Sequence, residues 1–96
     1  MAGEILGGGV KQITPGSDFL KLDAGSYFIT GSEIGTMVNG PSGLPTSSRF
    51  RVFVINHASK SYQTIFLFNN SNPNIWVAKK NGISNIAWTK ITSETV

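Results

Sequence analysis

Hydrophobic and polar positions alternate along the second half of the chain, in runs separated by short clusters of turn-forming residues. Residues 49–56, 62–68 and 75–79 are rich in β-branched and aromatic side chains, and Asn, Ser, Pro, Gly and Lys fill the gaps between them. Such runs, bounded by such clusters, are typical of antiparallel strands. Shorter runs at 26–30 and 86–91 predict two further strands. The pattern therefore predicts an all-β domain, a small antiparallel meander of about five strands.

The two longest runs do not separate an apolar face from a polar one. In residues 49–56, one set of alternate positions holds Phe50, Val52 and Val54, and the other holds Phe53 and Ile55. A strand that is apolar on both faces is predicted to lie in the centre of a sheet. We therefore expect the core to contain residues from these runs and from the closing strand, namely Phe50, Val52, Val54, Phe66, Phe68 and Trp88.

The segments outside these runs are less regular. Residues 1–17 contain three consecutive glycines and a Pro-Gly pair, and they are predicted to be a flexible leading segment. Residues 18–22 predict one short helical turn near the N-terminus. A loop rich in Gly and Pro is expected at 31–47, and residues 92–96 are predicted to fray. The folded domain is thus expected to span residues 18–91.

The charge pattern argues against two classes of partner. The net charge is +3, from 8 basic and 5 acidic residues that are spread thinly along the chain, whereas nucleic-acid-binding surfaces concentrate basic residues and interleave them with aromatics. The longest apolar runs are far too short to cross a bilayer. We therefore expect neither nucleic-acid binding nor membrane insertion. The low charged fraction, 14%, leaves a mostly neutral polar surface, which suits sugars and partner subunits.

No group of residues is spaced for catalysis or for metal binding. The chain has no cysteine and a single histidine, His57, in a predicted hairpin. Asp18, Asp23, Glu33 and Glu94 fall in loops or terminal segments, and local spacing pairs none of them, although pairing through the fold stays open. We therefore expect no enzymatic activity, no catalytic residues, no metal site and no cofactor.

The two tryptophans lie on the last two predicted strands, where they can meet across the ladder. They form either a packed pair in the core or one buried and one exposed ring. Core packing is the expectation for Trp88. Trp76 is the ring expected to be exposed and to stack on a sugar.

Four short motifs follow one another along the chain, namely Gly25-Ser26-Tyr27, Gln63-Thr64-Ile65-Phe66, Ile75-Trp76-Val77 and Trp88-Thr89-Lys90-Ile91. Their order and spacing resemble the pyocin-knob type of domain, which occurs in tail fibres, tailspikes and other receptor-binding proteins of bacteriophages. The resemblance extends over about residues 18–91, most of the chain. The resemblance implies a small β-sheet module of a virion appendage, often trimeric, that acts outside the cell together with other phage structural proteins. No enzymatic residue is implied.

Two functions follow from this resemblance as expectations. The first is attachment to a host cell-surface polysaccharide; the alternative is a structural spacer or trimerisation module without a ligand of its own. A glycan site is expected where the loop at 31–47 approaches a neighbouring hairpin, because loops carried on a rigid sheet often hold binding residues. The predicted ligand-binding residues are Trp76, Asn39, Ser42, Asn70 and Asn72.

Overall fold

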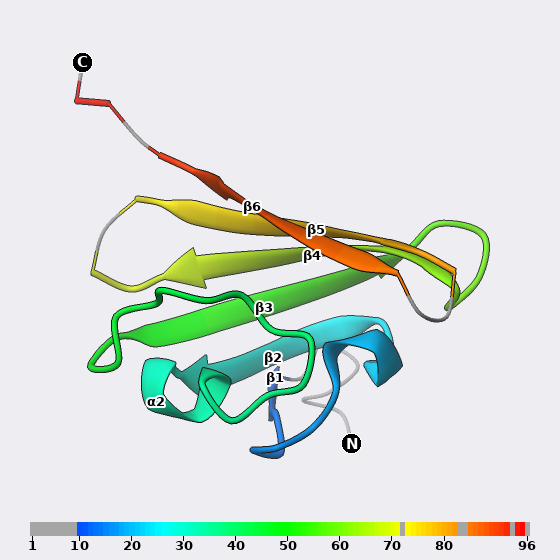
Figure 1. Ribbon diagram of the computed structural model, residues 1–96, viewed down its shortest axis with the longest axis horizontal. Coiled ribbons are helices and arrows are strands. Elements are labelled where there is room, and N and C mark those ends of the chain that lie inside the picture. The colour runs from blue at the N-terminus through cyan, green and yellow to red at the C-terminus, as the bar shows by residue number, and fades with distance from the viewer. Residues whose placement is uncertain (1–9, 72, 83–84, 93, 96) are drawn as a thin grey trace.

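The computed structural model describes residues 10–71, 73–82, 85–92 and 94–95, which form one six-stranded sheet with two short helical segments (Figure 1). The strands follow one another across the sheet in chain order; β2 to β6 are antiparallel, and β1 runs parallel to β2. The predicted all-β meander is confirmed, with six strands in place of about five. The strands are β1 (Val10–Gln12), β2 (Gly25–Thr30), β3 (Arg49–Asn56), β4 (Tyr62–Asn69), β5 (Ile75–Asn81) and β6 (Ile86–Ile91).

The additional strand, β1, lies in the segment that was predicted to be a flexible leader. Its last residue is followed by Ile13, whose N–H donates to the carbonyl oxygen of Phe28 at 3.1 Å and whose side chain is buried. The prediction is therefore wrong for residues 10–17, and residues 1–9 lie outside the described residues. Three strand residues are too few to show a period of two in the sequence.

The predicted helical turn near the N-terminus is confirmed as the 3-10 helix η1 (Phe19–Lys21), and Asp18 caps it by accepting a hydrogen bond from the Leu20 N–H at 2.9 Å. A second helix, α2 (Gly31–Ile34), lies inside the predicted loop. Its N-terminus is a capping box formed by Thr30 and Glu33.

The strand register divides the strand residues between two faces of the sheet. Val52 pairs with Leu67 and Phe53 with Phe66, so alternate residues of neighbouring strands line the same face. The covered face carries the core, and its buried strand residues are Tyr27, Ile29, Phe50, Val52, Val54, Gln63, Ile65, Leu67, Trp76, Ala78 and Lys80.

The covered face is closed by η1, α2 and the loop after α2, which lie on one side of the sheet (Figure 1). Phe19 of η1 is fully buried, and its ring meets Trp88 edge-on at 5.1 Å between centroids. Gly31 allows the loop to pass closely, because a Cβ there would lie 1.9 Å from the backbone oxygen of Pro45. The layer adds Ile13, Ile34 and other apolar side chains to the core.

Polar contacts also fasten this layer to the sheet. The ammonium group of buried Lys80 donates to the carbonyl oxygens of Leu20 and Lys60. The side-chain amide of Gln63 donates to the carbonyl oxygen of Leu22 at 2.9 Å. A buried cation is retained because two carbonyl oxygens replace part of its hydration.

The opposite side of the sheet, here called the open face, is not covered by any described segment. Three of the six predicted core residues, Phe50, Val52 and Val54, are buried, but Phe66 is half-buried and Phe68 is 36% exposed. Trp88 is half-buried against the core. The core prediction is therefore wrong for Phe66 and Phe68, which lie on the open face. The aliphatic, aromatic and basic strand residues of the open face are Val10, Phe28, Arg49, Arg51, Phe53, Ile55, Tyr62, Phe66, Phe68, Ile75, Val77, Lys79, Ala87 and Ile91.

The division into two faces predicts different costs for two similar substitutions on neighbouring strands. Phe50→Ala empties a buried site and should lower the free energy of unfolding by about 3 to 5 kcal/mol. Phe28→Ala removes a ring from the open face and should cost less than about 1 kcal/mol. Urea unfolding of both variants measures the difference. Equal losses would contradict the face assignment.

Candidate functional site

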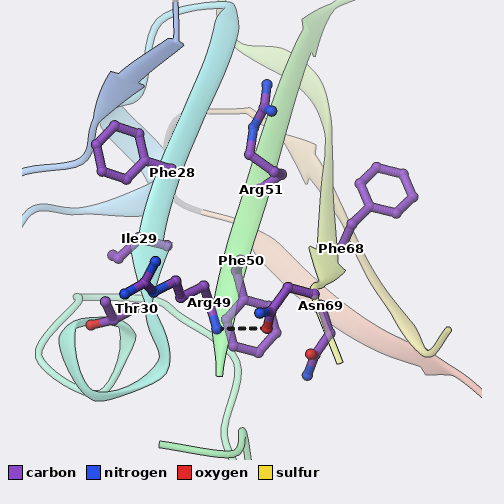
Figure 2. A pocket seen from close by; sticks show the side chains of 9 residues that line it. Phe28, Ile29, Thr30, Arg49, Phe50, Arg51, Phe68 and Asn69 are labelled. Atoms are coloured by element: carbon purple, nitrogen blue, oxygen red, sulfur yellow. Dashed lines mark hydrogen bonds between the residues drawn. The ribbon is translucent and has the colours of Figure 1, made fainter. Parts of the chain in front are cut away.

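A groove of about 510 Å³ lies on the open face, at the end of the sheet where β3 begins (Figure 2). Figure 2 shows Phe28 on β2 and Phe68 on β4, one on each side of β3. The Arg49 side chain reaches toward Thr30, whereas that of Arg51 extends in the other direction along β3. The groove is lined by Phe28, Ile29, Thr30, Arg49, Phe50, Arg51, Phe68, Asn69 and Asn70.

The sheet register places the central arginine between two aromatic rings. Phe28 pairs with Arg51, and Arg51 pairs with Phe68, so the three side chains form one row across β2, β3 and β4. Directly opposed side chains on one face lie about 5 Å apart at Cβ. Phe28 is 43% exposed and Phe68 is 36% exposed, so both rings present area to solvent.

The aromatic side chains next to the groove hold one another in place. Phe53 meets Phe68 edge-on at 5.5 Å between ring centroids, and Phe66 stacks on Phe68 at 6.2 Å. The Arg51 guanidinium carbon lies 5.3 Å from the centre of the Phe53 ring. These contacts restrict the orientation of Phe68 and Arg51 before any ligand arrives. A second hollow of about 580 Å³ continues the surface along Phe53, Ile55 and Phe66.

The open face is electropositive. Arg49, Arg51 and Lys79 lie on it, and no strand position on this face holds an acidic residue. The single ion pair found among the described residues joins Lys60 and Asp23, neither of which lies on a strand. The carboxylate of Glu33 accepts hydrogen bonds from Thr30 and Gln12 instead.

The side-chain amide of Asn69 is buried beside the groove. The register places Asn69 opposite Phe50, on the covered side of the sheet. Its Oδ1 accepts from the N–H and the hydroxyl group of Ser71, at 2.7 and 2.8 Å. Its Nδ2 is buried and has no acceptor among the described residues, and it does not face the open side.

The structure contradicts the expectation that Trp76 is an exposed stacking ring. Trp76 is 4% exposed and lies on the covered face, where its ring meets Phe50 edge-on at 5.7 Å. Its strand partner Leu67 is fully buried, which fixes the direction of both side chains. Lys90 covers the ring from β6 at 5.5 Å. Trp88, the other ring, donates from Nε1 to the carbonyl oxygen of Asn39 at 2.8 Å.

The predicted polar site residues are divided between two places. Asn39, in the left-handed conformation with φ 61°, donates from its side chain to Asp18 on the covered side of the sheet. Ser42 is exposed on the same loop and lines a hollow beside α2. Asn70 lines the groove, and its Oδ1 accepts a hydrogen bond from the backbone N–H of Arg49 at 3.0 Å. Asn72 lies outside the described residues. Of the three polar residues that the structure describes, only Asn70 thus belongs to the candidate site.

Ser48, the residue between the predicted loop and β3, contacts the hairpin after β4 through a hydrogen bond of 3.1 Å between its hydroxyl group and that of Ser71. The residues of the groove were missed because Phe28 and Phe68 resemble core residues in a sequence. The alternation of Arg49 and Arg51 on a predicted strand is the signal that points to an exposed face.

His57 follows β3 and is exposed, and its Nε2 lies 2.7 Å from the Thr64 hydroxyl oxygen. In residues 10–71, 73–82, 85–92 and 94–95, no three His, Asp or Glu side chains gather as metal ligands would. None of the helices in the described part of the chain has the length and apolar character of a membrane span. Comparisons with family models, curated proteins and solved structures found no match.

The contacts of Asp18 predict a pH dependence of stability. Hydrogen bonds from the Asn39 side chain and from the Leu20 N–H lower the pKa of the Asp18 carboxyl below its ordinary value of 3.8. The folded state therefore binds this proton less readily than the unfolded chain does. The stabilisation is present above pH 3.8 and is lost as the pH falls through the folded-state pKa.

Asp18→Asn keeps a capping oxygen but removes the charge, so its melting temperature should fall less than that of the wild type between about pH 5 and pH 2. Thermal unfolding followed by circular dichroism across this range measures the effect. Glu94→Gln, in the exposed C-terminal segment, is the control and should reproduce the wild-type profile. Superimposable profiles for Asp18→Asn and the wild type would show that these hydrogen bonds do not stabilise the fold.

Proposed function

We propose that this domain is a non-enzymatic attachment module of a bacteriophage tail fibre or related appendage, and that it binds host cell-surface polysaccharide through the open face. The motif resemblance to pyocin-knob domains supports the appendage. The observation that carries the binding proposal is the row Phe28, Arg51 and Phe68 beside the groove. Exposed rings with a few fixed polar groups between them are the usual composition of a ligand site.

The site on the open face replaces the one expected at the loop. Phe28 and Phe68 offer exposed apolar area on which the CH groups of a sugar ring can stack. They take the stacking role that was expected of Trp76. Asn70 and the two arginines offer hydrogen bonds at the end of the groove. Each neutral hydrogen bond contributes about 0.5 to 1.5 kcal/mol. Binding of one sugar unit is thus on the order of millimolar, and adhesion requires several copies on a repeating polymer, which a homotrimer supplies.

The purified domain on an array of bacterial polysaccharides should be retained by at least one of them, at physiological salt. Phe28→Ala combined with Phe68→Ala should remove retention, because both exposed rings are lost, while the circular dichroism spectrum stays that of a folded protein. Ser42→Ala, on the loop beside α2, is the matched control and should bind as the wild type does. No retention of the wild type, or retention that survives the double substitution, would contradict the proposal.

A second candidate function is the structural spacer or trimerisation module. Exposed apolar side chains outside the groove favour it, since Ile55, Tyr62 and Ile91 are each about half exposed on the same face. Contiguous exposed apolar surface commonly marks an association site. In this case the open face is buried between copies of the chain and is closed to a glycan.

Sedimentation equilibrium at tens of micromolar protein distinguishes the two candidates. We expect a homotrimer that persists when Ile55 and Ile91 are both replaced by Glu, since glycan attachment needs the open face to remain free. Dissociation of the Ile55→Glu, Ile91→Glu variant to folded monomers would favour the trimerisation module instead. A wild-type monomer at these concentrations would contradict trimer formation in both candidates.

A further inference from the structure

We infer that the groove between Phe28 and Phe68 recognises an anionic sugar residue, one that carries a carboxylate or a phosphate group. This inference rests on the proposed function and specifies its ligand. Arg51 is the principal anion-binding residue, with Arg49 as a further donor and the two phenylalanine rings as the walls that hold the sugar.

Neither arginine of the groove has a carboxylate partner in the part of the chain that the structure describes. Arg49 and Arg51 are both exposed, and no carboxylate among the described residues lies within ion-pair distance of either. Glu33, which is bonded to the neighbouring Thr30, has both carboxylate oxygens engaged by Thr30 and Gln12. The two guanidinium groups are therefore free to bind an external anion, and a planar guanidinium matches carboxylate and phosphate oxygens in pairs.

The charged groups that line the groove are donors. The guanidinium groups of Arg49 and Arg51 donate hydrogen bonds and cannot accept them. The acceptors beside them are already engaged. The Asn70 side-chain oxygen accepts the backbone N–H of Arg49, and the Thr30 hydroxyl group is hydrogen-bonded to the Glu33 carboxylate. A neutral sugar presents hydroxyl groups that both donate and accept. An acceptor-only group such as a carboxylate fits these donors better.

Arg51 lies between the two aromatic walls of the groove. It is one strand from each ring, so Phe28 and Phe68 are two strand spacings apart, roughly 10 Å. The contact of Arg51 with the Phe53 ring keeps the guanidinium at the surface of the sheet. A sugar seated on either ring thus brings a charged substituent to Arg51, and the apolar walls lower the local dielectric and strengthen that contact.

Lys79 offers a matched control for the net charge of the open face. It is an exposed cation on the same face but belongs to the row of Ile55 and Thr64, two rows from Arg51, and it donates to the Thr64 hydroxyl group at 3.0 Å. Loss of Arg51 and loss of Lys79 change the net charge equally. Of these two cations, only Arg51 lines the groove.

The test uses three immobilised polymers: polygalacturonate for the carboxylate, polyglycerol phosphate for the phosphate, and dextran as the neutral sugar. Binding is measured by biolayer interferometry at about 0.15 M salt, where charges more than about 8 Å apart are largely screened. We expect binding to at least one charged polymer and none to dextran. Which charged polymer binds identifies the anionic group.

Arg51→Gln should weaken that binding at least about tenfold, whereas Lys79→Gln should change it by less than about twofold. Arg51→Lys keeps the charge without the planar fork and should give an intermediate loss. Melting temperatures near that of the wild type show that the variants are folded. Equal losses for Arg51→Gln and Lys79→Gln would mean diffuse attraction and would overturn the inference.

The remaining outcomes separate the inference from the proposed function. Binding to dextran as strong as to the charged polymers, or retention on the array by neutral polysaccharides alone, would overturn the anionic ligand and leave glycan attachment standing. Binding to none of the three polymers and to no array polysaccharide would overturn both.

Discussion

The pairing register between β3 and β4 is the constraint on which the rest of the structure depends. Because Val52 lies opposite Leu67 and Phe53 opposite Phe66, the face of every strand residue is fixed, and a slip of one residue would exchange the two faces. Only one of these faces receives the layer of η1, α2 and the loop, where Phe19, Gly31 and Lys80 fit closely. The other face keeps its apolar side chains in contact with solvent.

This arrangement separates the residues that stabilise the fold from those that we propose bind a ligand. The covered face contains the buried rings and the satisfied polar groups, such as Trp76 and Lys80, so substitutions there act on folding. The open face contributes rings and arginines that the fold itself does not need to bury. A surface of this kind, apolar and electropositive at once, is free to take an external ligand, and the rigid strands beneath it hold the side chains in register.

The sequence was sufficient to predict where the strands lie, but not which of their side chains face the core. The bounds of β3 and β6 agree with the predicted runs, and the helical turn predicted at residues 18–22 is found there as η1. Phe66 and Phe68 were misplaced because both sets of alternate positions in β4 are apolar, and the covering segment that decides between them is remote in sequence. For the same reason Trp76 was expected at the surface. Of the described residues predicted to bind, Asn70 alone lies in the groove.

The most direct test of the account is an NMR titration that locates the ligand. With ¹⁵N-labelled protein and a soluble oligogalacturonate, the account predicts that the largest shift changes occur at the Arg51 side-chain N–H and at the backbone amides of Phe28, Phe68 and Asn70. The indole N–H of Trp88, bonded to Asn39 on the covered side, should not move. Shift changes confined to the loop at 31–47 and the Trp88 indole, with none at Arg51, would contradict the claim that the open face is the binding face.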